Sequence, residues 1–271
     1  MKLDRIAALL AKAERTDNPA EADAYLTKAQ LLATLASIDL ASARDHTRTR
    51  ESSVPITRTV TIGEKGKRAN THLVNLFVTV AHSNSTHVDV ARDSTYVIIF
   101  GMLSDLDTVE ALFASIAVQM TSHANTFVSS GSWRGEKFDA RIRINGSVTR
   151  RRTEFTAQTA RAAFYRAYIV RIDERLREGR EQAIKVNDHR NSSQIKSGGE
   201  SGALVLAGKE KTVADFHRST SQARGSWGGY SGSATANSGS ASSAGRSAAS
   251  RARLSDQQGL SGGRKQLPGG G

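Results

Sequence analysis

The sequence predicts an α+β protein: an N-terminal helical hairpin, a small mixed module with one long basic helix, and a disordered C-terminal tail. Three observations predict this. Apolar residues recur at helical spacing in some segments, alternate with polar residues in others, and become sparse from Ser226 onward. The boundaries that follow are 1–45 for the hairpin, 54–219 for the α+β module and 220–271 for the tail.

The hairpin is predicted from two amphipathic segments joined by a short connection. Ile6, Leu9 and Leu10 share one face of the first segment. Asn18-Pro19 then provides a cap and a proline at the first position of a second helix. A two-helix hairpin is too small to be stable alone, so its apolar faces must meet another surface.

The same residues carry a resemblance to a known family. They are Ile6-x-x-Leu9-Leu10-Ala11-Lys12-Ala13-Glu14-x-Thr16, Glu21-Ala22, Lys28-Ala29-Gln30-x-Leu32 and Ile38-Asp39. This pattern, over residues 3–39, resembles the bacterial and phage family called domain of unknown function 2786. Members usually carry an uncharacterised α+β module downstream, and the remaining layout of this chain is similar. The resemblance implies no activity and no catalytic residue, and it suggests a phage or mobile-element origin.

The first half of the module is predicted as strand, helix, two strands and helix. Alternating apolar residues indicate a strand over 54–62, and helical spacing indicates a helix over 69–83. Two strands follow over 86–91 and 96–100, joined by turn residues. Ser104 resembles the start of a capping box and opens the next helix.

The second half of the module begins with a predicted loop over 126–135, which is rich in Ser and Gly. Residues 138–144 alternate between apolar and charged, which favours a strand with a basic outer face. Gly146 and Ser147 break this strand, and the long helix then runs to Val186. The remaining expectations are a loop over 188–202, a short strand over 203–207 and a last helix over 209–219.

The tail from Ser226 to Gly271 is almost entirely Ser, Gly, Ala and Arg. Such a segment buries too little apolar area to offset an ordering entropy of about 1–2 kcal/mol per residue. Its cationic residues would form a sparse brush for phosphate backbone. They are Arg224, Arg246, Arg251, Arg253, Arg264 and Lys265.

Composition limits the classes of partner and the cellular compartment that are expected. The net charge is +12, divided as +1 over 1–50, −2 over 51–130, +7 over 131–190 and +6 over 191–271. A localised positive field attracts polyanions, nucleic acid first. The chain has no cysteine, so it can form neither a disulfide nor a thiolate metal site. Short apolar runs and the absence of a secretory signal predict a cytoplasmic protein with no membrane partner.

The candidate site is a cationic stretch with two interleaved aromatic residues, Trp133 and Phe138. Guanidinium groups suit phosphate, and aromatic faces can stack on unpaired bases. The alternative is a solvated surface of a basic protein. The predicted nucleic-acid-binding residues are Arg134, Lys137, Arg141, Arg143, Arg150, Arg151 and Arg152.

No enzymatic motif emerges from the remaining residues. His72, His82, His87 and His123 fit no metal-ligand spacing, and no G-x-S-x-G elbow occurs. Catalytic residues, metals and cofactors are therefore not assigned, and an enzyme is the less favoured class.

The resulting hypothesis is a non-enzymatic, nucleic-acid-associated accessory protein that binds phosphate backbone through the basic stretch and the tail. One alternative is a protein–protein adaptor that recruits its partner through residues 3–39. The other is an enzyme with an unrecognised site in the α+β module.

Overall fold

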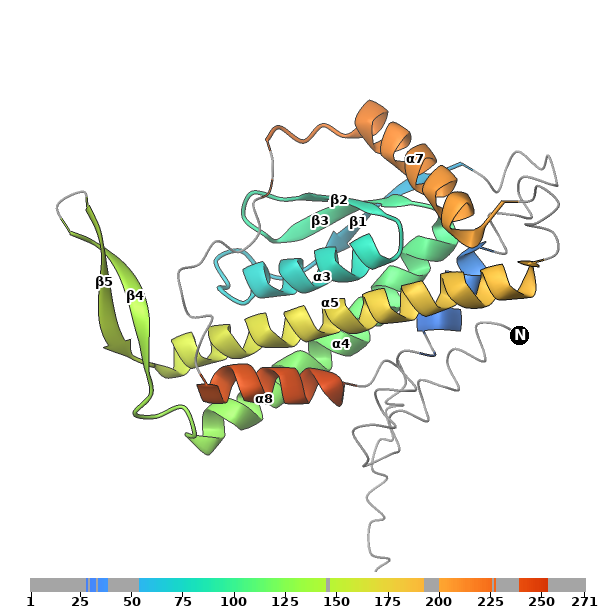
Figure 1. Ribbon diagram of the computed structural model, residues 1–271. Helices are drawn as coiled ribbons and strands as arrows, with labels where there is room; N and C mark the ends of the chain where they lie inside the picture. The colour runs from blue at the N-terminus through green and yellow to red at the C-terminus, as the bar shows by residue number, and fades with distance from the viewer. Residues whose placement is uncertain are drawn as a thin grey trace, which may run out of the picture.

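A computed structural model gives the architecture (Figure 1). The structure describes residues 28, 30–32, 34–38, 54–144, 147–192, 200–225, 227 and 239–252; at 140–148 and 150 only the backbone is described. The fold is mixed α+β, as predicted. The first predicted helix of the hairpin lies outside the described residues.

A three-stranded antiparallel sheet forms one layer. It contains β1 (Ile56–Thr61), β2 (His87–Val90) and β3 (Tyr96–Gly101) in the order β1-β3-β2. The central strand β3 is apolar on both sides because both of its faces are covered. Val97 and Ile99 lie in the main core, and Phe100 on the other face contacts α7.

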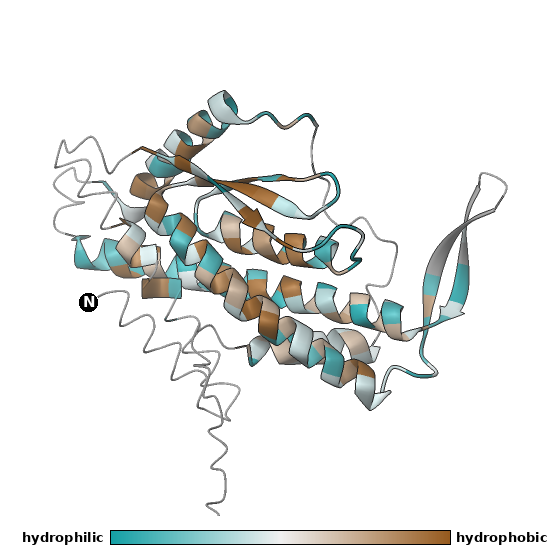
Figure 2. Ribbon diagram, turned by 180° about the vertical axis from the view of Figure 1, so that it is seen from behind, coloured by the Kyte–Doolittle hydropathy of each residue, from teal (hydrophilic) through white to brown (hydrophobic). Residues whose placement is uncertain are grey.

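Five labelled helices surround this sheet. α3 and α4 lie on the core face, α5 runs alongside them, α7 crosses the opposite face, and α8 lies against α5 and α4 (Figure 1). Their bounds are α3 Asn70–Ser83, α4 Leu103–Ser130, α5 Ala157–Arg190, α7 Gly202–Thr220 and α8 Gly239–Ser250. In Figure 2 the hydrophobic residues are concentrated in the sheet and in the helices beside it.

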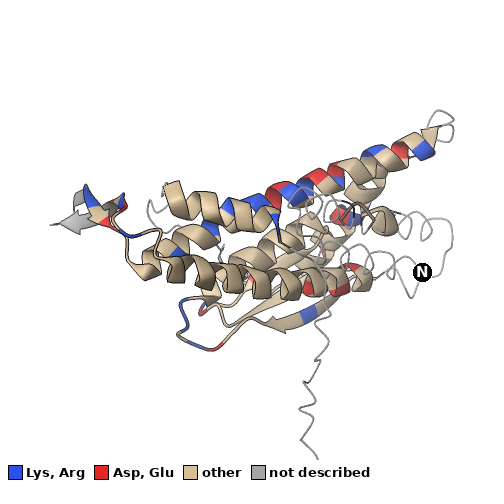
Figure 3. Ribbon diagram, turned by 90° about the horizontal axis from the view of Figure 1, so that it is seen from below, with Lys and Arg blue, Asp and Glu red and all other residues tan. Residues whose placement is uncertain are grey.

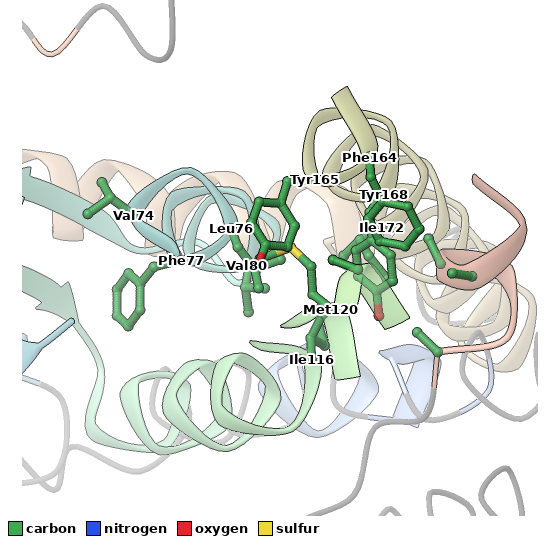
Figure 4. Packing of buried hydrophobic residues seen from close by; sticks show 14 of the residues in the cluster. Val74, Leu76, Phe77, Val80, Ile116, Met120, Phe164, Tyr165, Tyr168 and Ile172 are labelled. Atoms are coloured by element: carbon green, nitrogen blue, oxygen red, sulfur yellow. The ribbon is translucent and has the colours of Figure 1, made fainter. Parts of the chain in front are cut away.

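The main core lies where α3, α4 and α5 meet (Figure 4). Leu76, Met120 and Ile172, one from each helix, are completely buried. The rings of Phe127 and Phe164 stack with centroids 5.4 Å apart. Phe127 explains why α4 continues to Ser130, where the sequence predicted a loop: its burial outweighs the low helix propensity of the Ser-rich end.

A second correction concerns residues 147–154. The sequence predicted that the long helix begins soon after Ser147, but these residues form a strand, β5, and α5 begins at Ala157. A capping box marks that start: the Thr156 hydroxyl accepts from the Thr159 backbone N–H at 3.2 Å, and the Thr159 hydroxyl accepts from the Thr156 backbone N–H at 2.8 Å.

A third correction concerns the predicted strand at 203–207, which forms the first turns of α7. Ser201 caps this helix by accepting a bond from the backbone N–H of Leu204 at 3.3 Å. Leu206, Lys209 and Val213 are buried at spacings of three and four residues, which is a helical stripe.

The predicted disorder of the tail is wrong for residues 239–252, which form α8 and its last turn. Small residues allow this helix to approach α5 closely: a Cβ added to Gly245 would lie 2.5 Å from the carbonyl oxygen of Phe164. Ala241 and Ala249 are fully buried on the same side. The contact between α8 and α5 therefore depends on close approach of the two backbones and not on large apolar side chains. Composition alone does not reveal such a contact.

Arginines of α5 and α8 stabilise the contact between these two helices. The buried guanidinium of Arg175 donates to the backbone carbonyl of Ala249, at the C-terminal end of α8, where the helix dipole favours a cation. Both terminal nitrogens of Arg246 in α8 contact the Glu174 carboxylate, at 3.0 and 2.9 Å. The bidentate Arg246 contact lowers the pKa of Glu174.

The described part of the hairpin's second helix packs into the module. Residues 30–32 and 34–38 are helical, and Leu35 and Ile38 are buried. Ile38 lies in a small cluster with Val205 and Leu206 of α7. Ile38 therefore has apolar partners within the chain, and most of residues 3–39, on which the adaptor hypothesis depends, lie outside the described residues. In the described part of the chain, no helix is both long and apolar enough to span a membrane.

Candidate nucleic-acid interface

A two-stranded hairpin carries most of the predicted site. It consists of β4 (Lys137–Ile144) and β5 (Ser147–Glu154), which we call the arm. The strands are antiparallel and pair with each other, and Figures 1 and 3 show the arm projecting from the helical body. A projecting two-stranded ribbon gains no stability from a covering layer.

The register of the arm places all of its charged residues except Arg151 on one face. Residues directly opposite each other share a face, and side chains alternate along each strand. Arg141 is opposite Arg150, and Asp139 is opposite Arg152. We call this set the cationic face: positions Lys137, Asp139, Arg141, Arg143, Val148, Arg150, Arg152 and Glu154.

Charge on this face changes from the base of the arm to its tip. At the base, Lys137 pairs with Glu154 at 3.5 Å. Beyond Asp139 the sequence has no acidic residue until Glu154. The whole arm has six cationic and two acidic residues, a net charge of +4, and the surplus lies in the distal part. The tip is therefore a concentrated source of positive potential.

The register of the ribbon pairs positions of like charge. Cβ atoms of directly opposite residues lie about 4.5–5.5 Å apart, and diagonal neighbours about 7–8 Å. Arg141 and Arg150 are direct partners, while Arg143 and Arg152 are their diagonal neighbours. Such pairs destabilise a ribbon by about 0.2–1 kcal/mol each, and a bound anion would offset this repulsion.

Aromatic residues anchor the base of the arm. The rings of Phe138 and Phe155 lie 4.6 Å apart, and Phe155 is buried in the main core. Trp133 packs against the same core, and its indole N–H donates to the carbonyl of Val128 at 3.0 Å. Trp133 and Phe138 are therefore half-buried by packing within the chain, and their role as base-stacking residues stays a prediction.

The other residues of the predicted site lie on or beside the arm. Arg134 is exposed in the turn before β4, with its guanidinium carbon 5.8 Å from the centre of the Trp133 ring. Arg151 and Arg152 are exposed on β5 and form no ion pair with the side chains that the structure describes. The hairpin thus brings residues from two sequence segments together, while Arg134 remains at its base.

Several arginines of the helical body are paired with carboxylates. Arg177 contacts Asp173, Arg171 contacts Glu178 at 3.2 Å, and the described α5 shows alternating blue and red along its distal half in Figure 3. Arg246 is paired with Glu174, so it is not part of the predicted cationic brush. The brush residues Arg253, Arg264 and Lys265 lie outside the described residues.

A second polar cluster, which the sequence did not predict, joins α7 to β2. His217 Nε2 lies 2.8 Å from Asp89 Oδ1, and Ser221 donates to the other oxygen of the same carboxylate. The His87 ring stacks on His217 with centroids 5.1 Å apart. Burial is the main cause that lowers the pKa of His87, followed by repulsion from His217 and His82. Period-two alternation places His87 and Asp89 on one face, but only the fold reveals that α7 covers it.

The four histidines singled out from the sequence are not gathered into one site. His72 packs on Tyr165 at 5.1 Å, whereas His87 stacks on α7. His123 belongs to α4 and His82 to the end of α3. Within the described ranges, no group of three or more His, Asp or Glu residues has an arrangement that could hold a metal ion.

A buried ion pair connects the N-terminal helical residues to the body. Lys209 Nζ donates to Asp105 Oδ2 at 2.9 Å and to the hydroxyl of Ser37, which itself donates to Asp105 Oδ1 at 3.2 Å. Burial lowers the pKa of Lys209, and Asp105 acts in the opposite direction. Close by, Arg180 binds both Glu210 and the hydroxyl of Ser85. These polar groups satisfy one another's hydrogen bonds, as in a buried network that stabilises the fold.

Comparison with known protein families identifies a match at the N-terminal end of the chain. The model of the family described as "Protein of unknown function (DUF2786)" matches residues 2–40, in agreement with the resemblance noted from the sequence. No curated protein and no solved structure matches the chain. The match does not reach the arm, and the family's description states no activity.

Proposed function

We propose that this protein is a non-enzymatic, nucleic-acid-associated accessory protein that binds phosphate backbone through the arm. The observation that carries the proposal is the division of charge between arm and body. Several described arginines of the body, among them Arg171, Arg177 and Arg246, are paired with carboxylates, whereas the sequence of the distal part of the arm has cationic residues and no acidic ones.

Phosphate binding accounts for this division in physical terms. Lysine and arginine residues that neutralise phosphates release condensed counterions, which favours binding at low salt. Exposed ion pairs of the body have already satisfied their charge and contribute little further. In this proposal the arm supplies the attraction, and the cationic residues of the tail, Arg253, Arg264 and Lys265, add sequence-independent affinity.

A salt titration tests the proposal. Affinity for a fluorescently labelled DNA duplex would be measured by anisotropy between about 50 and 200 mM salt. If about four or five phosphates are neutralised, log K falls with log salt at a slope near −4. Absence of binding at the lowest salt concentration would overturn the proposal.

Two charge-matched triple variants locate the binding surface. The arm variant R150Q/R151Q/R152Q should make the slope shallower by about 3 and raise Kd by at least about tenfold. The control R177Q/K211Q/R218Q removes the same charge from exposed residues paired with Asp173 or Asp215. Its Kd should change by less than about threefold, because Asp173 and Asp215 already compensate two of the three charges. Equal losses in the two variants would show that net charge, and not the arm, determines binding.

A further inference from the structure

We infer that the ligand of the arm is double-stranded B-form DNA, and that the arm enters its major groove. This inference rests on the proposed function and specifies its substrate. The structural basis is the combination of a projecting two-stranded ribbon, one cationic face and aromatic residues confined to the base.

The dimensions of the arm suit that groove. Each strand has eight residues, which extend roughly 25 Å at about 3.3 Å per residue. Paired strands lie about 4.8 Å apart. The major groove of B-form DNA is about 12 Å wide and 8.5 Å deep, and it admits a two-stranded ribbon. The projection of the arm beyond the helices leaves its distal part free to enter (Figure 1).

The location of the aromatic residues argues against single strands. Proteins that bind unpaired strands without sequence preference stack bases on aromatic side chains, at about 1–3 kcal/mol per base. From Asp139 to Glu154 the arm contains no Phe, Tyr or Trp. Phe138, Phe155 and Trp133 are held in the packing at the base. The arm therefore offers charge and backbone without a stacking platform.

Charge density also favours a duplex. Arg141, Arg143, Arg150 and Arg152 occupy neighbouring positions of one face. Duplex DNA carries one negative charge per about 1.7 Å of axis, twice the density of a single strand of the same rise. Phosphates from the two walls of a groove can then compensate several of these arginines together, which a flexible strand does only with a further loss of entropy.

The groove shape distinguishes DNA from RNA. A-form RNA has a deep and narrow major groove that side chains cannot reach, and its accessible minor groove is wide and shallow. A two-stranded ribbon therefore finds no groove of matching width and depth in A-form RNA. Binding that depends on groove entry should therefore favour DNA over an RNA duplex of the same sequence.

Three probes of one sequence test the inference with the full-length chain: a DNA duplex, one of its strands alone, and the RNA duplex. At equal salt, Kd for the DNA duplex should be at least about tenfold lower than for either other probe. Equal or tighter binding of the single strand or the RNA would overturn this inference but leave phosphate binding by the arm intact. Failure to bind any probe would overturn the proposed function itself.

Methylation protection identifies the groove. Guanine N7 lies in the major groove, so the wild-type chain should protect it from dimethyl sulfate. The R150Q/R151Q/R152Q variant should lose this protection at protein concentrations where the R177Q/K211Q/R218Q control retains it. Tight duplex binding with unprotected N7 would overturn groove entry.

Discussion

Substitution of Gly245 by alanine is the sharpest test of how α8 is held in the core. An added Cβ would lie 2.5 Å from the carbonyl oxygen of Phe164, 3.0 Å from the Cβ of Ala167 and 3.2 Å from the backbone N of Tyr168. Ordinary contacts begin near 3.4 Å, and two of the three atoms belong to the backbone of α5. No side-chain rotation can relieve the overlap, so α8 must move.

The expected magnitude follows from two opposing effects. Extra volume in a packed core costs about 1–3 kcal/mol. Alanine in place of glycine within a helix stabilises by about 1 kcal/mol, which offsets part of this cost. Movement of α8 also weakens the bond from buried Arg175 to the carbonyl of Ala249, and an uncompensated buried charge is costly. The net loss should be about 1–2 kcal/mol.

Gly208 in α7 is the matched control, because it is an exposed helical glycine whose added Cβ would meet no atom within 4 Å. G208A should stabilise the protein by about 0.5–1 kcal/mol. Urea unfolding and thermal melting of both variants measure the difference, which corresponds to roughly 4–8 °C in Tm. If G245A is as stable as G208A, the close approach of α8 to α5 is refuted.

Three further stability predictions concern buried or capping groups. K209M should lose about 3–5 kcal/mol in urea unfolding because Asp105 stays buried without its cation, and the double variant K209M/D105L should recover most of that loss; an equally unstable double variant would contradict this. His72 has its pKa lowered to about 4, first by burial and then by Arg166, so the unfolded chain binds a proton that the folded chain does not between about pH 6.5 and 4. The free energy of unfolding should fall by about 3 kcal/mol as the pH is lowered from about 6.5 to about 4. The H72L variant, compared with wild type at these two pH values, should lack this decrease. T156A removes the cap of α5 and should lower the unfolding free energy by about 1 kcal/mol, whereas T212A, on the exposed side of α7, should change it by less than about 0.5 kcal/mol.

The sequence of the arm contains a local hairpin signal, but the prediction of a helix after Ser147 overrode it. Asn145-Gly146 between two alternating segments is a strong two-residue hairpin signal. The run Arg150 to Arg152 hides the alternation of the second strand, because arginine is compatible with helix and strand alike. Ile144 and Ser147 are indeed direct partners. Proximity of Arg141 and Arg150 could then have been predicted from the turn alone.

α8 illustrates the opposite case, in which no local signal was sufficient. Its stripe of Ala241, Gly245 and Ala249 has little apolar area of its own. It is stable because α5 offers a surface that such small residues can approach closely, and because Arg175 meets its C-terminal carbonyls. The pairing of Arg246 with Glu174, which removes one cation from the predicted brush, depends on the same contact.

By itself, the sequence determined the mixed α+β class, the sheet strands at 56–61, 87–90 and 96–101, and the excess of positive charge after residue 130, because these depend on local periodicity and composition. Only the tertiary structure decided which described arginines contact carboxylates, as Arg246 does with Glu174, since that depends on neighbours far along the chain. It also decided that Trp133 and Phe138 are packing residues, because burial by other elements is not encoded in their spacing. Arg171 and Arg177 of α5 therefore form ion pairs, while the sequence of the arm carries a net charge of +4.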